Sequence, residues 1–259
     1  MPAPESPSVP VTVGVQDGVA RISLDRPPLN VLDIDMLRQL NEALRQCDRT
    51  SIRVVLLASA QPRAFSAGVD VADHIPERLD AMLAAVRENA RLLLNLGPVT
   101  LAAIHGSTLG GGAEIALLCD LVIAADDVIF GFPEIKLGAF PPVAAACLSE
   151  SGLGPRAMRL LLGESIDAGA AHDVGLVSHV VAASRLVDTA DRLARELAGF
   201  SEVALRALTA ATRRQRAATI LRRLDAAIAI YRTTIAPSRD AGEGIRAFLE
   251  KRAPVWGHR

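Results

Sequence analysis

Two glutamates, Glu114 and Glu134, are the residues of this chain whose type and setting best suit acid–base chemistry. Each lies in an apolar stretch after a segment typical of a buried strand, and an unpaired carboxylate is costly to bury there. Sheets of parallel strands gather their active sites at the carboxyl ends of the strands. Two acids in one chain are nevertheless more often unrelated surface or helix-capping groups. They are therefore candidates for a shared proton-transfer site.

A run of three glycines offers a second kind of chemistry. Gly110, Gly111 and Gly112 stand between an expected strand and a short helix that includes Glu114. The first N–H groups of a helix have no intrahelical partner and favour negative charge, so they suit an oxygen that becomes anionic during a reaction. A phosphate cradle is another interpretation, although the spacing of the usual glycine-rich phosphate motifs is absent. Close packing of helix on strand explains the glycines equally well.

A third segment, residues 64–70, follows an expected strand at 54–58 and reads Ala-Phe-Ser-Ala-Gly-Val-Asp. Its small residues allow a ligand to approach the backbone, and Gly68 permits dihedral angles that other residues resist. Asp70 is well placed to cap the turn that follows. Taken alone, this segment is a turn of small residues after a strand.

The elements that must hold these groups alternate between strand and helix. Asp17-Gly18 predicts a hairpin between strands at 11–15 and 19–24, and Asp33 can cap a helix that ends near 47. Continuous apolar runs predict buried strands, and helices are expected between them. This order indicates an α/β fold with a largely parallel sheet. The remaining expected elements are strands at 54–58, 99–104 and 121–125, helices at 77–96 and 114–118, and an almost entirely helical pattern from 155 onward.

Three regions follow from this pattern: a flexible tail at 1–10, a core at 11–195 and a helical region at 196–259. The chain has 259 residues, half of them hydrophobic and 3% aromatic, which predicts an aliphatic core. A formal net charge of −1 gives no reason to expect nucleic acid as a partner. The basic clusters at 213–216 and 222–223 are interpreted as a solvated helix face.

The chain lacks several signals of other protein classes. Its three cysteines are scattered, which predicts buried free thiols and neither disulfides nor a zinc site. The five histidines lack metal-ligand spacing, so we expect no metal. Neither a membrane span nor a secretion signal is evident, and we expect a cytoplasmic protein without a membrane partner.

The motifs Phe-Ser-Ala-Gly-x-Asp and Gly-Gly-Gly-x-Glu, in this order and spacing, resemble those of the enoyl-CoA hydratase/isomerase family, also called the crotonase superfamily. The resemblance covers nearly the whole chain, from Arg26-Pro27-Pro28 to Ala253-Pro254. It implies a crotonase-like spiral of repeated ββα units with a C-terminal helical region. That region makes the contacts of a homotrimer or a dimer of trimers.

The resemblance also assigns residues to an acyl-CoA thioester as substrate. It places the two oxyanion-hole amides at Val69 and Gly111 and the two catalytic carboxyl groups at Glu114 and Glu134. Coenzyme A is part of the substrate, and no separate cofactor is implied. The residues expected to contact coenzyme A are Ala67, Gly68, Asp70 and Val71, with Lys251 of a neighbouring subunit near the nucleotide.

After Glu134 the chain departs from the glycine-rich run of ordinary short-chain hydratases. It reads Gly-Ala-Phe-Pro-Pro-Val, so two prolines stiffen the turn and Phe140 adds bulk near the acyl group. This variant resembles the branch that hydrates cyclohexa-1,5-diene-1-carbonyl-CoA, which predicts a cyclic or conjugated acyl group. His74, just after the 64–70 segment, is a second candidate contact to that group.

Two carboxyl groups and two N–H donors together suit hydration of an α,β-unsaturated thioester. Glu134 would deliver a proton to the α carbon and Glu114 would assist the attack of water. Two alternatives stay open: an isomerase that moves the double bond, and a relative that binds acyl-CoA or RNA without catalysis.

Overall fold

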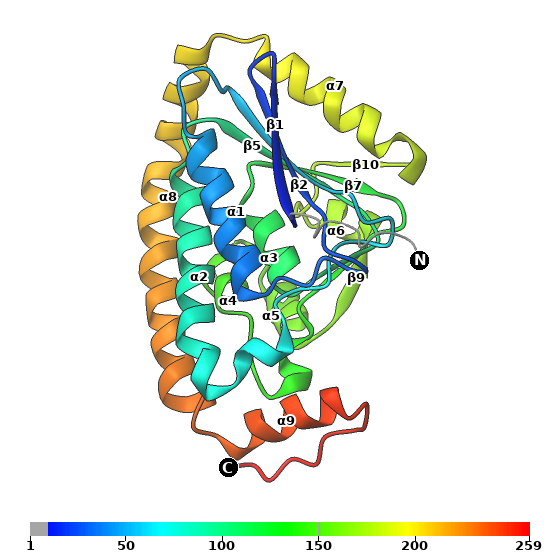
Figure 1. Cartoon of the computed structure of the whole chain (residues 1–259), viewed down its shortest axis with the longest axis vertical. Helices are drawn as coiled ribbons and strands as arrows, with labels where there is room; N and C mark the ends of the chain where they lie inside the picture. Colours follow the sequence, from blue (N-terminus) through cyan, green and yellow to red (C-terminus); the bar gives the residue numbers. More distant parts are fainter. Residues whose placement is uncertain (1–9, 150) are drawn as a thin grey trace, which may run out of the picture.

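The computed structural model describes residues 10–149 and 151–259. The tail expected at 1–10 therefore lies, apart from residue 10, outside the described residues. The described part folds as two sheets with helices around them, in agreement with the α/β class predicted from the sequence (Figure 1).

The larger sheet is built from the continuous apolar runs that the sequence marks as buried strands. Within the described residues its order is β1-β2-β3-β5-β7-β10, and all neighbours are parallel except the β1–β2 hairpin, which turns at Asp17-Gly18 as expected. Every residue of β5 is buried, which matches its lack of polar alternation. Its strands are β1 (Val11–Gln16), β2 (Val19–Leu24), β3 (Val54–Ser59), β5 (Val99–Ile104), β7 (Leu121–Ala125) and β10 (His179–Val181).

The smaller sheet takes one short strand after each central strand of the larger one. Strands β4, β6 and β8 run parallel, and β9 closes the edge antiparallel to β8. Because each pair is followed by a helix, β3-β4-α2, β5-β6-α3 and β7-β8-α4 form successive ββα units, which confirms the expected spiral. The smaller sheet comprises β4 (Ala64–Ser66), β6 (Ser107–Leu109), β8 (Ile129–Gly131) and β9 (Ser165–Asp167).

Helices cover both faces of the larger sheet. The α7 helix packs its alanines and Leu186 against one face, and α1, α2 and α3 share a larger core on the other. Asp33 caps α1 by accepting a hydrogen bond from the Met36 N–H at 2.8 Å, as predicted. The α-helices are α1 (Ile34–Cys47), α2 (Pro76–Asn95), α3 (Gly111–Leu118), α4 (Pro142–Leu148), α5 (Pro155–Leu161), α6 (Ala168–Asp173), α7 (Leu186–Ala198), α8 (Glu202–Ile230) and α9 (Arg239–Leu249).

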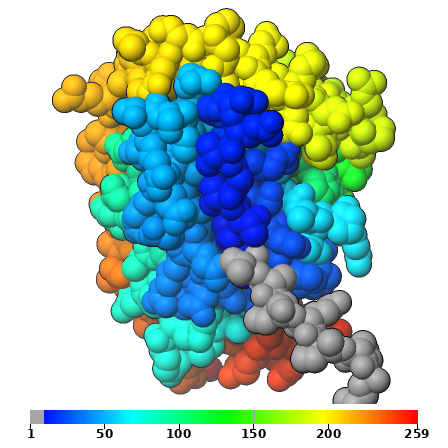
Figure 2. Space-filling model, turned by 45° about the horizontal axis from the view of Figure 1, so that its top comes forward, coloured from blue at the N-terminus to red at the C-terminus, as the bar shows by residue number. Residues whose placement is uncertain are grey.

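Short helical turns complete the chain. Three are 3₁₀-helical, η1 (Val71–His74), η2 (Pro133–Leu137) and η3 (Ala183–Arg185), and η4 (Tyr231–Ile235) is a π-helical turn. Figure 2 shows β1 (dark blue) exposed on one face, with the segment around the start of α8 (yellow) above it and α9 (red) below. Within the described residues, no helix has both the length and the apolar character needed to cross a membrane.

One prediction from the sequence is wrong here. Residues beyond 155 are not almost entirely helical, because β9 and β10 lie there. Each has three residues and sits at the edge of its sheet, too short to leave an alternating pattern. Glu134 lies in the 3₁₀-helical turn η2. The boundary expected at 195 falls inside α7 and stays a prediction.

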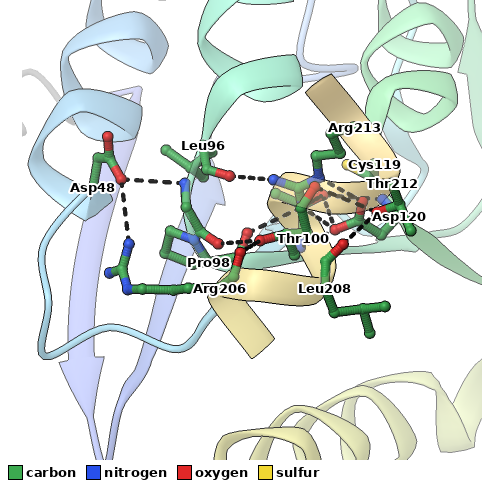
Figure 3. Close-up of polar contacts among 12 residues, drawn as sticks. Asp48, Leu96, Pro98, Thr100, Cys119, Asp120, Arg206, Leu208, Thr212 and Arg213 are labelled. Carbon is green, nitrogen blue, oxygen red and sulfur yellow. Dashed lines mark hydrogen bonds and ion pairs between the residues drawn. The ribbon is translucent and has the colours of Figure 1, made fainter. Parts of the chain in front are cut away.

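A buried arginine fastens α8 to the core, although the sequence suggested a solvated basic face at this position (Figure 3). Arg213 is 5% exposed and donates to Asp120 from Nε at 2.7 Å and to the Pro98 carbonyl at 3.0 Å, with a further bond to the Leu96 carbonyl. Arg214 beside it is exposed, so the prediction holds there and is wrong for Arg213. The carboxylate and the carbonyls between α2 and β5 supply the partners that a buried guanidinium needs.

We predict that Arg213→Met lowers the free energy of unfolding by about 3 kcal/mol, because it removes the guanidinium that pairs with Asp120 and donates to two carbonyl groups. Denaturant unfolding followed by circular dichroism measures the loss. Arg214→Met is the matched control and should change stability by less than about 0.5 kcal/mol. Equal stability of the two variants would contradict this account of α8.

Candidate active site

A cavity of about 110 Å³ lies where α2, α3, η2 and η4 meet the segment 67–71. A larger hollow of about 330 Å³ beside β1 is lined by the Arg21–Asp191 ion pair and an exposed strand, so it offers no buried pair of acids. The structure brings most of the predicted site residues to the smaller cavity. Those on its lining are Ala67, Gly68, Val69, Val71, His74, Gly111, Glu114, Glu134 and Phe140.

Hydrogen bonds of Asn30 hold the segment 64–70 in place. Its buried side-chain amide donates to the Phe65 carbonyl at 3.0 Å and to Ser59 Oγ at 2.7 Å. Ser66 Oγ donates to the Asn30 carbonyl at 2.7 Å and accepts from the Gly68 N–H at 3.1 Å. Neither Asn30 nor Ser66 was predicted from the sequence to position this segment. The sequence offered one signal for each residue. Asn30 is a polar residue shortly after two prolines, and Ser66 is a serine among apolar neighbours.

The three consecutive glycines each leave room for a different neighbour. A Cβ on Gly110 would lie 2.6 Å from Glu134 Oε1, and one on Gly111 would lie 2.7 Å from Val69 Cγ2. A Cβ on Gly112 would lie 2.6 Å from Ser66 Cβ. Gly110 also has a φ of 51°, a left-handed conformation that glycine adopts readily. The glycines therefore allow close packing and also leave the N–H groups at the start of α3 uncovered by side chains. Close packing and an anion-binding helix start are thus compatible interpretations of the motif.

The backbone amides of Val69 and Gly111 lie next to each other. The bridge between Leu32 and Val69 uses the carbonyl of Gly68 and the N–H of Asp70, so the Val69 N–H is left out of it. Gly111 is the first residue of α3, and a Cβ placed on it would lie 3.4 Å from the Val69 nitrogen. Neither N–H donates to an acceptor within the described chain. Both are free to bind a ligand, and their joint action on one oxygen stays a prediction.

Glu114 is a buried carboxyl with hydrogen bonds on one oxygen. It projects from α3, is 4% exposed, and its Oε1 accepts from the N–H groups of Val143 at 2.8 Å and Ala144 at 2.9 Å. Burial raises its pKa, and these two hydrogen bonds act in the opposite direction because they favour the ionised form. The start of α4 thus provides a partner for a carboxylate at this position.

Glu134 has no such support. Its Oε2 is buried and has no hydrogen-bond partner among the described residues. Burial raises the pKa of Glu134, and the nearby charge of Glu114 raises it further. Since two neighbouring carboxylates resist ionising together, a state of the pair with one proton is favoured over the doubly ionised one. The hydrogen bonds assign the charge to Glu114 and the proton to Glu134.

Two aromatic rings form a wall of the cavity. Phe140 packs against Tyr231 with ring centroids 5.3 Å apart and planes tilted by 47°. Tyr231 is 3% exposed and lines the cavity with both glutamates. Tyr231 was not predicted from the sequence as a site residue, because it lies far along the chain in a helical pattern. The available signal was that it is the single tyrosine of the sequence.

The remaining predicted site residues have different settings. His74 faces the cavity, and its Nδ1 lies 3.0 Å from the Asp70 carbonyl; burial lowers the pKa of His74, so the ring is neutral. Asp70 does not line the cavity, because its carboxylate caps η1 by accepting from the Ala72 N–H. Lys251 lies exposed beyond α9, also off the cavity. Its expected contact was with a neighbouring subunit and stays a prediction.

Thiol and metal chemistry find no support at this site. Cys47 and Cys119 are buried as expected, Cys147 is half-buried, and burial raises the pKa of all three thiols. Thiols so protonated are poor nucleophiles. Among the described residues, no cluster of histidine, cysteine, aspartate and glutamate could hold a metal ion.

Comparisons with known proteins agree with the spiral of ββα units and with the two motif segments at the cavity. Residues 14–259 match the sequence profile described as enoyl-CoA hydratase/isomerase, so the chain belongs to this family. The cyclohexa-1,5-dienecarbonyl-CoA hydratase of Thauera aromatica is 36% identical over 262 residues, which cover 97% of this chain and 98% of the relative.

Two further proteins show how widely the likeness extends. The 2,3-dehydroadipyl-CoA hydratase of Escherichia coli K12 is also 36% identical, over 93% of this chain and 96% of that protein. Among solved structures, an enoyl-CoA hydratase from Mycobacterium avium subsp. paratuberculosis K-10 superposes with a TM-score of 0.83 at 26% identity, covering 96% of this chain and 99% of that one. The chain therefore shares both fold and length with these relatives.

Replacing Glu134 by glutamine should stabilise the fold in a pH-dependent manner. A carboxyl whose pKa is raised on folding favours the folded state below its ordinary value of 4.5, and this contribution is lost as the pH rises toward the folded-state value. We therefore expect Glu134→Gln to raise the free energy of unfolding by about 1 kcal/mol at pH 8 and to leave it unchanged at about pH 5.

Denaturant unfolding at the two pH values measures this difference. Glu196→Gln, which alters an exposed glutamate of α7, is the control and should have little effect at either pH. A loss of stability in Glu134→Gln at pH 8 would show that the carboxylate is favourably bound in the fold, contrary to this assignment.

Proposed function

We propose that the protein is a hydro-lyase that adds water across the α,β double bond of an acyl-CoA thioester. One observation carries the proposal: a buried carboxyl group, Glu114, and a half-buried one, Glu134, share a small cavity with two free backbone N–H groups. One carboxyl has hydrogen bonds that favour its ionised form, and the other has an oxygen with no partner. A base, an acid and a site for a negatively charged oxygen are the parts that hydration requires.

The proposed reaction begins with the thioester oxygen bound by the N–H groups of Val69 and Gly111. Glu114, as the carboxylate, accepts a proton from water as the water oxygen bonds to Cβ. The electron pair of the double bond moves toward the thioester, and the two amides stabilise the resulting enolate oxygen. Glu134 then gives its proton to Cα. One water is consumed, and the pair is left with its proton moved from Glu134 to Glu114.

Coenzyme A is proposed to bind along the segment that leads out of the cavity. Ala67, Gly68 and Val71 lie on its lining and offer little side-chain bulk, while Asp70 adjoins them with its backbone. Lys251 from a neighbouring subunit is proposed to reach the nucleotide in a homotrimer or a dimer of trimers. Since coenzyme A arrives with the acyl group, no further cofactor is proposed. Three free thiols are compatible with a reducing cytoplasm.

The lining of the cavity argues for an uncharged acyl group. The two relatives described above have equal identity to this chain but different substrate names, one a cyclic diene and the other an adipyl thioester with a second carboxylate. Among the described residues, neither lysine nor arginine lines the cavity, so a second carboxylate would find no cation there. Phe140 and Tyr231 offer flat apolar surfaces instead. A conjugated, ring-shaped acyl group suits them best.

Hydration should depend on both glutamates. We predict that Glu114→Gln and Glu134→Gln each lower kcat about 100-fold or more, because one removes the base and the other the acid. Cyclohexa-1,5-diene-1-carbonyl-CoA, crotonyl-CoA and 2,3-dehydroadipyl-CoA form the substrate panel. Mass spectrometry detects the gain of one water, and loss of the ultraviolet band of the conjugated thioester gives the rate.

The panel separates the alternatives. An isomerase would shift the absorbance without a change in mass, and a binding protein would leave both unchanged. Near-wild-type hydration by either glutamine variant would rule out the two-carboxyl mechanism. Faster hydration of the adipyl thioester than of the uncharged ones would contradict the proposed acyl group.

The contact between Gly111 and Val69 gives an independent test of the amide pair. A methyl group at residue 111 must displace the stiff Val69 side chain, which lies 2.7 Å from the position of the new Cβ, and so shifts the Val69 amide. We predict that Gly111→Ala lowers kcat/KM about 100-fold, which is typical of the loss of one hydrogen-bond donor from an oxyanion hole. Gly14→Ala, where a Cβ meets nothing within 4 Å, is the control and should retain activity.

A further inference from the structure

Tyr231 enters the active-site cavity from the C-terminal helices. It begins η4 directly after α8, and a π-helical turn of this kind often marks a functional position. Its ring packs on Phe140 and also borders a second hollow of about 180 Å³ beside α9. The side chain thus stands between the two glutamates and the helical region, with 3% of its surface exposed.

The hydroxyl group of Tyr231 has no hydrogen-bond partner in the described part of the chain, although a buried tyrosine usually finds one. Burial raises the pKa of Tyr231, and the charges of Glu134 and Glu114 raise it further. The group is therefore a neutral O–H that can donate a hydrogen bond. Tyr231 lines the cavity together with both carboxyl groups, so this donor belongs to the part of the site that holds the two acids.

Other donors near the glutamates are already engaged or missing. The N–H groups of Val143 and Ala144 both donate to Glu114, and Pro142 before them has no N–H to offer. The lining residues from the described chain include no serine, threonine, asparagine, glutamine, lysine, arginine or tryptophan.

The histidine on the lining does not supply a donor either. His74 uses Nδ1 toward a backbone carbonyl, so in the neutral ring its Nε2 is an acceptor. This leaves the Tyr231 hydroxyl as the side-chain donor on the lining apart from a protonated glutamate. The amides of Val69 and Gly111 are assigned to the thioester oxygen at the other part of the site.

We propose that the Tyr231 hydroxyl donates a hydrogen bond to the oxygen atom that is added to Cβ, and so holds the water between Glu114 and Glu134. The proposal rests on the hydration function proposed above. A water that gives its hydrogens to two carboxyl groups still has lone pairs, and one of them can accept this bond while the other attacks. The O–Cβ bond forms, the water proton goes to Glu114, the Glu134 proton goes to Cα, and the phenol keeps its own proton.

Tyr231→Phe tests this role because it removes the hydroxyl and keeps the ring against Phe140. We expect kcat for hydration to fall about 10-fold, the size of one lost hydrogen bond, with KM unchanged. The same enzyme should exchange the α protons of butyryl-CoA for deuterium in D₂O. That exchange uses the two amides and Glu134 but no added water, so Tyr231→Phe should leave its rate unchanged.

The two reactions separate a chemical role from a structural one. A thermal unfolding midpoint of Tyr231→Phe equal to that of the unsubstituted protein would verify that the fold is intact. Hydration at the wild-type rate would overturn the proposal, and so would an equal loss of both reactions, which would assign Tyr231 to packing. If the unsubstituted protein hydrated none of the thioesters in the panel, the proposed function itself would fail and this inference with it.

Discussion

The close approach of two backbone segments, one at Gly68-Val69 and the other at Gly110 to Gly112, is the constraint on which the rest of the site depends. The segments come from successive ββα units and meet because the smaller sheet aligns β4 with β6 in parallel. Side chains at the three glycines would collide with Glu134, Val69 and Ser66. Their absence brings two free amides together and lets a carboxyl group lie against the turn before α3. Asn30 holds the first segment in place, so the geometry exists before any ligand arrives.

That geometry has an energetic cost, which falls unequally on the two acids. Glu114 is buried but accepts hydrogen bonds from two backbone N–H groups in the first turn of α4. Pro142, which has no N–H group, is the first residue of that helix, and the next two residues provide these donors. Glu134 is half-buried, its buried Oε2 has no partner among the described residues, and it is repelled by Glu114. A fold selected for stability alone would replace it with a neutral residue. Retaining two acids with opposite protonation at one cavity is how enzymes combine an acid and a base near neutral pH.

The sequence alone predicted the parts of the fold that have a strong local signal. Apolar runs marked β3, β5 and β7 within a residue of their ends, and Asp33 and Asp17-Gly18 marked a helix start and a hairpin. It could not predict β9 and β10, whose three residues form strands only through their neighbours. Arg213 looked like its solvated neighbours, because its burial depends on carbonyls at the end of α2 and the start of β5. For the site, glycine motifs and resemblance indicated the segments, but the charge assignment of Glu114 and Glu134 required their hydrogen-bond partners.

The C-terminal helical region, expected to serve subunit contacts, also completes the cavity. Arg213 fixes α8 to Asp120 near the end of α3, and eighteen residues later Tyr231, the first residue after α8, reaches the cavity that the glutamates line. At 1.5 Å per residue this is about 27 Å of rigid spacing, so the Tyr231 hydroxyl is placed by packing along α2 and α4 and not by a flexible loop. The π turn at η4 then sets the direction of the ring against Phe140. A change in how α8 rests on the core would therefore alter the cavity wall formed by Phe140 and Tyr231 while leaving the amide pair intact. The pair of free amides and the ring of Tyr231 are thus held by separate parts of the chain.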